Sequence, residues 1–445
     1  MTWWAIAIAA SVACNDRGAA SPPLLSPPTM DAATAPSPDA MTIDASIATV
    51  DAGADAGPPP CPATPWASYG HDPARTSASD GCAEGPLTVT WKLTRQGQCG
   101  YTFRTGRILH VVADENAIFA AVSCGGSPAV MRVTTAGEAA WTFSRADYGR
   151  GSWPALAGDA ILSVDDGVFL VDRETGKWRG RELDVWGEPL VVSDRFFVDN
   201  TFQLDGSGPF VGAFDASFKW GWRASNINAG KGPKVPRTGG IAYSDGIIVH
   251  SAAMGARAVP SLAAHDATSG DKRWVALGVW PESAPSIAEG RVFTVERWNG
   301  ETGDRLVARS LADGAVHWSK AIAWTRGPAP VIAEQLVLIH GAEGVRAHDR
   351  ATGALVWSNP TPRKAANDEA ATTMAAAKGS RTLVVTSGPR VVVLKLEDGT
   401  EQWSGAVVTG ASATSLGGLT VERPVIVGRT VYVTSDGTLL RLDPK

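Results

Sequence analysis

The stretches Asp266-Ala-Thr-Ser-Gly-Asp-Lys-Arg-Trp274 and Asp349-Arg-Ala-Thr-Gly-Ala-Leu-Val-Trp357 are two copies of one phrase. In both, Gly follows Asp by four residues and Trp follows Gly by four. The second half of the phrase recurs, with the same spacing, as Gly137–Trp141, Gly314–Trp318 and Gly399–Trp403. Five copies with one spacing predict a repeat protein, and the repeat decides the architecture.

Three further Trp residues extend the series. Asp172 to Trp178 is a compressed copy, Asp215 to Trp220 is a copy without its Gly, and Gly85 to Trp91 supplies a copy near the N-terminus. Successive Trp residues of the series lie 37 to 54 residues apart, which is the length of one propeller blade. The predicted repeat positions are Trp91, Trp141, Trp178, Trp220, Trp274, Trp318, Trp357 and Trp403, eight of the 17 Trp residues.

The phrase has a physical logic at each of its positions. The Asp side chain can accept hydrogen bonds from the backbone that follows it and so close a turn. The Gly supplies a positive φ angle, and the Trp begins the next strand and packs between sheets. The glycines assigned to this structural role are Gly270, Gly314, Gly353 and Gly399.

The units number eight. Each has a short apolar strand, a polar turn and a more hydrophobic strand, as in Pro330-Val-Ile followed by Leu336-Val-Leu. The eighth unit stops near Leu442 without a Trp strand, and residues 87–94 offer the missing strand. We therefore predict an all-β fold, an eight-bladed β-propeller of four-stranded antiparallel blades, closed by this N-terminal strand in the last blade. The alternative is an open array of seven blades with a stray N-terminal strand.

Composition supports one modular domain over residues 62–445, because a propeller grows by adding blades. The chain of 445 residues has a formal net charge of −5, so electrostatics gives no reason to expect nucleic-acid binding. We expect a monomeric propeller.

The N-terminus is expected to be a targeting signal. Residues 1–13 contain an apolar stretch of signal-peptide length that ends just before Cys14. Small residues before a Cys predict a lipoprotein signal, with a lipid anchor on Cys14. Ser11 and the absence of Lys or Arg before the apolar run depart from the usual pattern, and an ordinary secretory signal is the alternative. Residues 14–61, rich in Ala, Pro, Ser and Asp, are predicted to be a disordered tether.

The remaining cysteines, Cys61, Cys82, Cys99 and Cys124, all lie in the first third of the chain. An even number in an exported protein predicts two disulfides. Three pairings are open, and we favour the local ones, Cys61–Cys82 and Cys99–Cys124.

The repeat phrase and the segment from Pro65 to Thr76 resemble the PQQ-binding-like (quinoprotein-like) β-propeller family. The resemblance covers residues 62–445, and the nearest type is the non-catalytic outer-membrane propeller lipoprotein. It implies the propeller fold, but it leaves function open, because the family also contains dehydrogenases that carry PQQ and calcium.

The features that the resemblance would imply for an enzyme of that family are not found in the sequence, because no two cysteines are adjacent and there is no Cys-x-x-Cys-His motif. A Ser-His-Asp nucleophile site is a separate possibility that sequence order leaves open, and no Gly-x-Ser-x-Gly turn stands out for it. We therefore expect no catalytic residue, no metal site and no cofactor, although PQQ and calcium stay open.

Binding through loops is the second class of function. Several strand connections are basic and could form a rim for an acidic partner, although Asp and Glu on the same connections favour scattered solvated charge. A third class is glycan or small-ligand binding, for which Trp153, Trp280, Trp298 and Trp324 are candidates. The rim residues are Arg150, Lys231, Lys234, Arg237, Arg326, Arg363 and Lys364.

Taken together, these patterns favour an exported protein of the bacterial cell envelope, anchored to the outer membrane through Cys14. We expect a scaffold that binds envelope proteins, with assistance in outer-membrane protein assembly as the specific hypothesis. A PQQ- and calcium-dependent dehydrogenase-like enzyme and a glycan-binding propeller are the alternatives.

Overall fold

The structure is a computed structural model. It describes residues 61–68, 70–94, 107–124, 127–144, 153–164, 167–183, 187–200, 210–225, 240–254, 259–323, 329–341, 343–360, 373–387, 390–407, 423–435 and 437–445. The described residues all belong to one compact unit, Pro59–Lys445. Every regular element among them is a β-strand, and none of them forms a helix of the length and hydropathy that crossing a bilayer requires.

The first four blades are consecutive antiparallel sheets. Blade 1 contains β3 (Arg107–Ala113), β4 (Ala117–Cys124), β5 (Ser127–Thr134) and β6 (Ala139–Ser144). Blade 2 contains β7 (Trp153–Ala157), β8 (Ala160–Val164), β9 (Gly167–Asp172) and β10 (Trp178–Leu183). Blade 3 contains β11 (Pro189–Val192), β12 (Arg195–Asn200), β13 (Phe210–Asp215) and β14 (Trp220–Ser225). Blade 4 contains β15 (Ile241–Ser244), β16 (Ile247–Met254), β17 (Val259–Asp266) and β18 (Lys272–Leu277).

The other four blades continue the pattern, with two additional strands. Blade 5 contains β20 (Ser286–Ala288), β21 (Arg291–Trp298), β22 (Asp304–Ser310) and β23 (Val316–Ile322), and β19 (Val279–Pro281) also pairs with β21. Blade 6 contains β24 (Val331–Ala333), β25 (Leu336–Gly341), β26 (Gly344–Asp349) and β27 (Leu355–Asn359). Blade 7 contains β28 (Thr373–Ala377), β29 (Thr382–Ser387), β30 (Arg390–Lys395) and β31 (Glu401–Ala406), and β1 (Ala78–Ser79) runs parallel to β28. Blade 8 contains β32 (Val425–Val427), β33 (Thr430–Ser435), β34 (Thr438–Pro444) and β2 (Leu87–Thr94).

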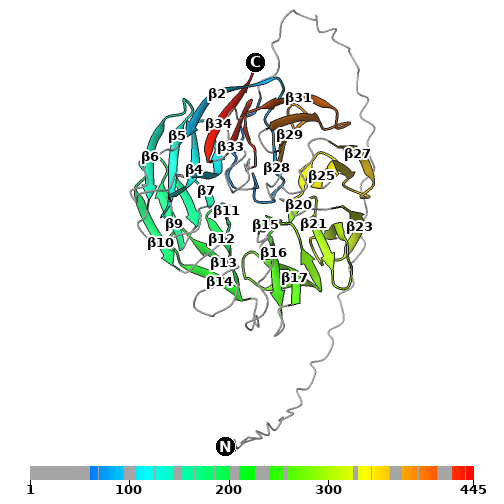
Figure 1. Cartoon of the computed structure of the whole chain (residues 1–445). Coiled ribbons are helices and arrows are strands. Elements are labelled where there is room, and N and C mark those ends of the chain that lie inside the picture. Colours follow the sequence, from blue (N-terminus) through cyan, green and yellow to red (C-terminus); the bar gives the residue numbers. More distant parts are fainter. Residues whose placement is uncertain are drawn as a thin grey trace, which may run out of the picture. The chain divides into compact units, whose positions relative to one another are not determined.

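The blades form a closed ring, as Figure 1 shows. The innermost strand of each blade contacts those of its two neighbours, and β32 of blade 8 contacts β3 of blade 1. The ring closes because β2, coloured blue, pairs antiparallel with β34, coloured red, from Leu87 opposite Pro444 to Thr94 opposite Thr438. Both the eight-bladed fold and the closing role of residues 87–94 are confirmed, and the open array of seven blades is excluded.

Burial explains why these sequences form these strands. The inner strands β8 and β28 are buried at every residue, whereas β2, an outer strand, alternates between half-buried and exposed residues after Leu87. Inner strands are covered on both faces by the adjacent blades, so they read as continuous apolar runs. Outer strands have one solvated face, so their sequences alternate.

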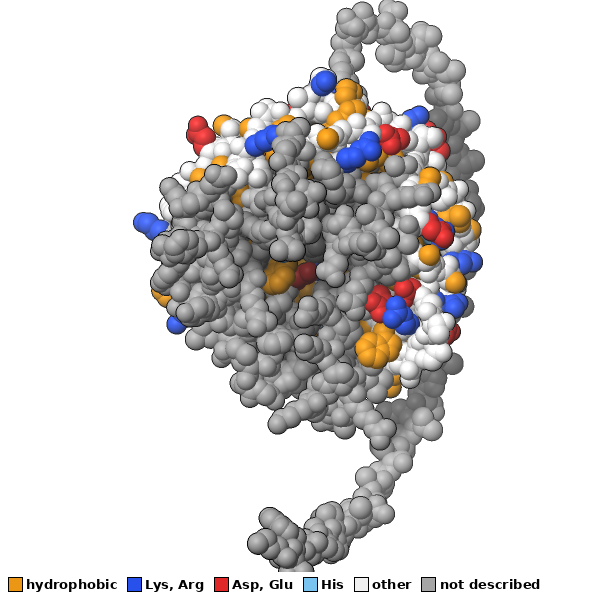
Figure 2. All heavy atoms as spheres, viewed as in Figure 1, with side chains coloured by type: hydrophobic (Ala, Val, Ile, Leu, Met, Phe, Trp, Pro, Cys, Tyr) orange, Lys and Arg blue, Asp and Glu red, His pale blue; other side chains and the backbone are white. Residues whose placement is uncertain are grey.

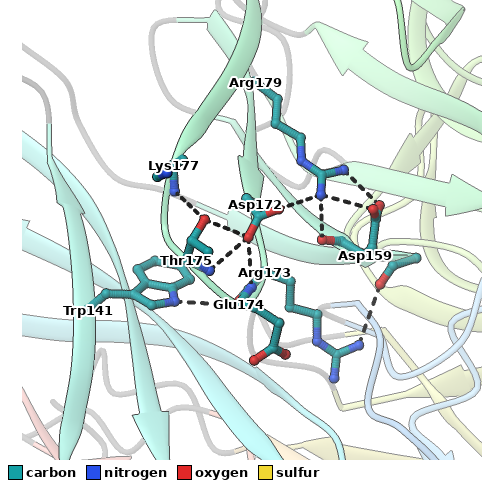
Figure 3. A network of polar contacts seen from close by, with 9 residues as sticks. Trp141, Asp159, Asp172, Arg173, Glu174, Thr175, Lys177 and Arg179 are labelled. Atoms are coloured by element: carbon teal, nitrogen blue, oxygen red, sulfur yellow. Dashed lines mark hydrogen bonds and ion pairs between the residues drawn. The ribbon is translucent and has the colours of Figure 1, made fainter.

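The repeat Trp residues join each blade to the next. In Figure 3, the indole of Trp141 in blade 1 donates from Nε1 to the carbonyl of Arg173 in the turn of blade 2, over 3.2 Å. Gly176 of that turn has φ +70°, and a Cβ placed on it would lie 2.7 Å from Cδ2 of Trp141. Two features therefore require Gly at this position: its positive φ, which residues with a Cβ rarely adopt, and the indole ring, which leaves no space for a Cβ.

Five other joints have this geometry, with the indole donating to a turn carbonyl and lying against a Gly of positive φ. The pairs are Trp91 with Gly137, Trp222 with Gly270, Trp274 with Gly314, Trp318 with Gly353 and Trp357 with Gly399. At the eighth blade the turn is replaced by the N-terminal strand, and a Cβ on Gly85 would lie 2.3 Å from Cβ of Trp403.

The sequence assignment is wrong at two of these positions. Strand pairing places Gly180, and not Trp178, at the repeat position of blade 2, and Trp178 is 58% exposed. In blade 3 it places Trp222, and not Trp220, at the repeat position. The reason is a change of residue type at a position whose spacing is kept: Gly180 lies four residues after Gly176, and Trp222 lies four residues after Phe218, so a search for Gly and Trp selected the neighbouring Trp178 and Trp220.

At the joint between blades 2 and 3 the small and the large residue are interchanged. Gly180 stands where the other joints have Trp, and Phe218 stands in the turn where they have Gly. A Cβ on Gly180 would lie 2.5 Å from Cε2 of Phe218, so the Phe ring occupies the space that the missing indole leaves. Phe218 also adopts φ +61°, the left-handed conformation of the glycines that it replaces.

Candidate functional site

The lead-in segment, residues 61–86, follows the inner strands around the ring. Trp66 exchanges backbone hydrogen bonds with Ala113 of β3, and the Ala67 carbonyl accepts from Leu156 of β7. The next carbonyls of the segment accept from one inner strand after another, in chain order. These bonds are Pro73 with Tyr243, Ala74 with Ile287, Thr76 with Ile332 and Ser77 with Ala376.

The segment therefore contacts the blades in their chain order. At its end, the Cys82 amide donates to Gly428, next to β32 of blade 8, and Cys82 forms a disulfide with Cys61. This is one of the two pairings that the sequence favoured. The disulfide and the backbone bonds fix the lead-in segment against the inner edge of the ring.

A polar cluster lies where the lead-in segment passes blades 3 and 4. Arg75 is 3% exposed and forms an ion pair with Glu188, which precedes β11. Arg75 also lies close to Gly240, where its Cζ would be 3.3 Å from an added Cβ. Asp199 of β12 is 2% exposed in the same place. In the view of Figure 2, acidic and hydrophobic side chains are visible at the centre of the ring.

Burial sets the protonation of this cluster. It raises the pKa of Asp199 to about 8, and the Glu188 carboxylate acts in the same direction, while the Gly240 amide and Arg75 oppose it. His250 lies with Nδ1 4.0 Å from Oδ1 of Asp199, and burial lowers its pKa to about 3, with His265 in the same direction. At neutral pH, therefore, Asp199 is mostly protonated and His250 is neutral.

A further histidine with a lowered pKa, His110, lies in blade 1. His110 of β3 stacks on Trp153 of β7 with ring centroids 5.4 Å apart, so Trp153 has a packing role there. Burial lowers the pKa of His110 to about 4, and Arg423 acts in the same direction. These two histidines are held neutral in the structure.

Blade 5 contains a fully paired buried charge. Glu296 is completely buried and accepts two hydrogen bonds from Arg309, over 2.8 and 2.7 Å. The hydroxyl of Thr294 and the indole of Trp298 also donate to Glu296. Because every carboxylate oxygen has partners, the charge is compensated in place.

Sequence reasoning missed both polar clusters. The available signal was a charged residue inside an otherwise apolar strand, as in Val292-Phe-Thr-Val-Glu296 or Phe196-Phe-Val-Asp199. A charge at such a position is buried by the fold, so it needs either a partner or a shifted pKa.

The donor set does not fit calcium, which requires six to eight oxygen ligands. In the described ranges, no group of three or more His, Cys, Asp or Glu side chains is placed to hold a metal ion. Glu188 is paired with Arg75, and the raised pKa of Asp199 disfavours its carboxylate form. We therefore derive no chemical step through calcium or PQQ.

Most predicted binding residues fall outside the described residues. This applies to Cys14, to Cys99, to Trp324 and to the whole basic rim, namely Arg150, Lys231, Lys234, Arg237, Arg326, Arg363 and Lys364. Cys124 ends β4, but its pairing with Cys99 stays a prediction. Trp280 lies in β19, and Trp298 binds Glu296, so Trp298 is part of the buried cluster.

Comparison with known families bears on the ring from the end of blade 3 to blade 8. A family model described as outer membrane protein assembly factor BamB matches residues 210–344 and, in an overlapping match, residues 260–444. The two matches together span more than half of the chain, from the end of blade 3 to blade 8. The chain belongs to this family. A search of curated proteins returned no match.

Solved structures agree with this BamB-like propeller fold. BamB from Moraxella catarrhalis aligns with a TM-score of 0.55 and 14% identity, over 80% of this chain and 99% of that one. Quinohemoprotein alcohol dehydrogenase from Comamonas testosteroni aligns with a TM-score of 0.58 and 12% identity, over 86% and 81%. The computationally designed Ika8 protein aligns at 0.54 and 11%, over 77% and 98%. At such identities the likeness concerns the fold, which BamB, an alcohol dehydrogenase and a designed protein share.

Proposed function

We propose that this protein is a non-catalytic scaffold of the bacterial cell envelope that assists outer-membrane protein assembly. The observation that carries the proposal is the match of the BamB family model to blades 4 to 8 and the end of blade 3. The buried polar groups are in keeping with it, because Arg75 and Glu188 are paired with each other and Glu296 is paired with Arg309.

The scaffold would act through strand connections. Three basic residues, Lys231, Lys234 and Arg237, lie on one connection and are the first candidates for contact with an acidic partner. Charged rims of this kind steer association and depend on salt.

In-cell cross-linking of the full-length protein tests the proposal. We expect reproducible capture of β-barrel assembly components, identified by mass spectrometry, and a loss of capture when Lys231, Lys234 and Arg237 are changed together to Ala. Changing Lys177 and Lys272 to Ala is the matched control and should leave capture unchanged, because both are exposed, at the starts of the outer strands of blades 2 and 4. If no component of that machinery is captured, the proposal is wrong.

A separate proposal concerns location. We propose that the chain is exported, cleaved before Cys14 and lipidated there, with residues 14–61 acting as a tether. Cells fed labelled palmitate should label the wild-type protein, and Cys14→Ser should abolish the label. Labelling that persists in the variant would contradict the anchor.

Titration with PQQ and calcium separates the scaffold from the enzymatic alternative. We expect no saturable PQQ binding to the full-length protein. Tight binding of PQQ together with alcohol oxidation would overturn the non-catalytic proposal.

A further inference from the structure

A pocket of about 330 Å³ opens between the turns of blades 3 and 4, away from the polar cluster around Arg75. Its size is at the lower end of the range for ligand sites, which suits one side chain better than an extended ligand. The lining combines indoles, two carboxylates and two cations, and Gly221 is part of its wall. The lining residues are Asp194, Arg195, Ala213, Phe214, Asp215, Lys219, Trp220, Gly221, Trp222 and Thr268.

The same place in blade 2 is filled by an arginine, as Figure 3 shows. Arg179 donates to the carboxylate of Asp159 over 2.8 and 2.9 Å and to Oδ2 of Asp172 over 2.5 Å. Asp159 lies in the turn between β7 and β8, and Asp172 begins the turn between β9 and β10. One guanidinium thus joins the two turns of its blade.

Strand register identifies the equivalent residues in blade 3. Asp194, between β11 and β12, corresponds to Asp159, and Asp215, at the end of β13, corresponds to Asp172. Arg179 is the bulged residue between Trp178 and Gly180 of β10, and the bulged residue of β14 is Gly221, between Trp220 and Trp222. Blade 3 therefore keeps both aspartates and lacks the arginine.

In blades 2 and 4, the two carboxylate oxygens of the turn aspartate accept hydrogen bonds from different groups. In blade 2, Oδ1 of Asp172 accepts from the turn, and Oδ2 accepts from Arg179. In blade 4, Oδ1 of Asp266 accepts from Thr268 and Ser269, and Oδ2 accepts from the bulged residue Arg273 over 2.5 Å. A carboxylate of this turn thus presents Oδ2 to a guanidinium in both neighbouring blades.

In blade 3, Oδ1 of Asp215 accepts from Ser217 and from the Lys219 amide, as the turn requires. Within the described part of the chain, no side chain donates to its Oδ2, and neither Arg195 nor Lys219 forms an ion pair with Asp194 or Asp215. Arg195 instead donates to the Ala267 carbonyl in blade 4 over 3.2 Å. The guanidinium position is thus vacant in blade 3, although the groups that hold it elsewhere are present.

We propose that this pocket is a binding site for a guanidinium group, supplied by an arginine side chain of a partner protein. The arginine would pair with Asp194 and with Oδ2 of Asp215, as Arg179 pairs with Asp159 and Asp172 in blade 2. Trp222 lines the same pocket, and so does Trp220, whose ring already carries the Arg223 guanidinium 3.7 Å from its centroid, so this indole is one on which a guanidinium stacks. The site does not depend on the proposed role in outer-membrane protein assembly, since a free arginine or another guanidinium ligand offers the same chemistry.

Calorimetric titration of the full-length protein with N-acetyl-L-arginine amide tests the site. N-acetyl-L-citrulline amide is the matched probe, because it has nearly the same shape without the charge. We expect saturable binding of the arginine probe and at least tenfold weaker binding of the citrulline probe. Added salt should weaken binding of the arginine probe. Equal binding of the two probes, or no binding of either, would overturn the proposal.

Variants locate the binding in the pocket. Asp194→Asn should weaken binding of the arginine probe at least tenfold. Gly221→Arg should abolish this binding, because the chain itself then supplies the missing guanidinium. Asp159→Asn is the matched control in blade 2, where the position is already filled, and it should leave binding unchanged. The proposal is wrong if Asp159→Asn weakens binding as much as Asp194→Asn does. Should Gly221→Arg fail to fold, the Asp194→Asn comparison still decides.

Comparing the binding of two further ligands identifies the source of the guanidinium. A capped Ala-Arg-Ala peptide that binds at least as tightly as free L-arginine upholds the partner protein as the source. If free L-arginine binds more than tenfold tighter than the peptide, the source is a small molecule and the partner assignment is overturned.

Discussion

The joint between blades 2 and 3 should be convertible to the common form by two substitutions that each destabilise the protein alone. The pair is Gly180→Trp and Phe218→Gly. Each single change breaks the complementarity that the structure shows, in which a Cβ on Gly180 would lie only 2.5 Å from the Phe218 ring. Together they recreate an indole over a Gly turn, as in Trp91 over Gly137.

The magnitudes follow from burial and conformation. Removing a fully buried Phe side chain costs about 3–5 kcal/mol, and Phe218 is only half-buried, so its ring is worth about 2 kcal/mol. A Gly at φ +61° relieves about 1 kcal/mol of strain, so Phe218→Gly should cost about 1 kcal/mol. Gly180→Trp overpacks the joint and should cost about 2 kcal/mol.

If the two effects were independent, the double variant would lose about 3 kcal/mol. We expect instead a loss of less than about 1 kcal/mol, which is a favourable coupling of about 2 kcal/mol. The turn has room for this exchange, because the Phe218 amide bonds to the Asp215 carbonyl just as the Gly137 amide bonds to Thr134.

Urea unfolding followed by tryptophan fluorescence measures these free energies. As a control, Gly180→Trp combined with Gly353→Ala, at a distant joint, should be additive. Additivity of Gly180→Trp with Phe218→Gly would refute the reasoning, because it would mean that the two side chains do not share one space.

Three other predictions concern single positions. Trp318→Ala should cost about 3–5 kcal/mol, because the indole is buried and bonded to the Arg350 carbonyl, whereas Trp178→Ala should change stability by less than about 0.5 kcal/mol; thermal unfolding of both variants compares them, and equal losses would contradict the docking role. Arg309→Met should cost about 3–5 kcal/mol by leaving Glu296 buried without its ion pair, and the double variant with Glu296→Gln should recover part of the loss; urea unfolding decides, and no recovery would contradict the pairing. The pKa of Asp199 is raised in the folded state to about 8, so its contribution to stability is present below the unfolded pKa and is lost as pH rises towards 8; Asp199→Asn should therefore gain stability relative to wild type between pH 4 and pH 8 in thermal melts, and a constant difference would show that Asp199 does not titrate there.

Much of the fold could be predicted because its signals are local. The Asp turn, the Gly of positive φ and the apolar runs each depend on a few consecutive residues, so the phrase at Asp266 to Trp274 marked its own place in a blade. The closing strand was predictable for a related reason. In the sequence, the eighth unit lacked its outer strand, and residues 87–94 formed a strand with the repeat Trp that belonged to no other unit.

The candidate sites could be predicted only in part. The pocket depends on Gly221 standing at the bulge of β14, and the misassignment of Trp178 and Trp220 shows that the repeat position is hard to locate in sequence where Gly180 replaces its Trp and Phe218 replaces its Gly. The cluster joins Arg75 to Glu188 and Asp199, which lie more than a hundred positions further along the chain.

The sequence by itself therefore determined the repeat, the number of blades and the closure of the ring, because turn conformation and strand burial are encoded within each unit. Only the tertiary structure decided which aromatic residue docks at each joint, where the lead-in segment runs and which aspartates lack an arginine. Those features depend on side chains from different blades meeting in space, and such meetings are set by register and packing between blades, which no single unit contains.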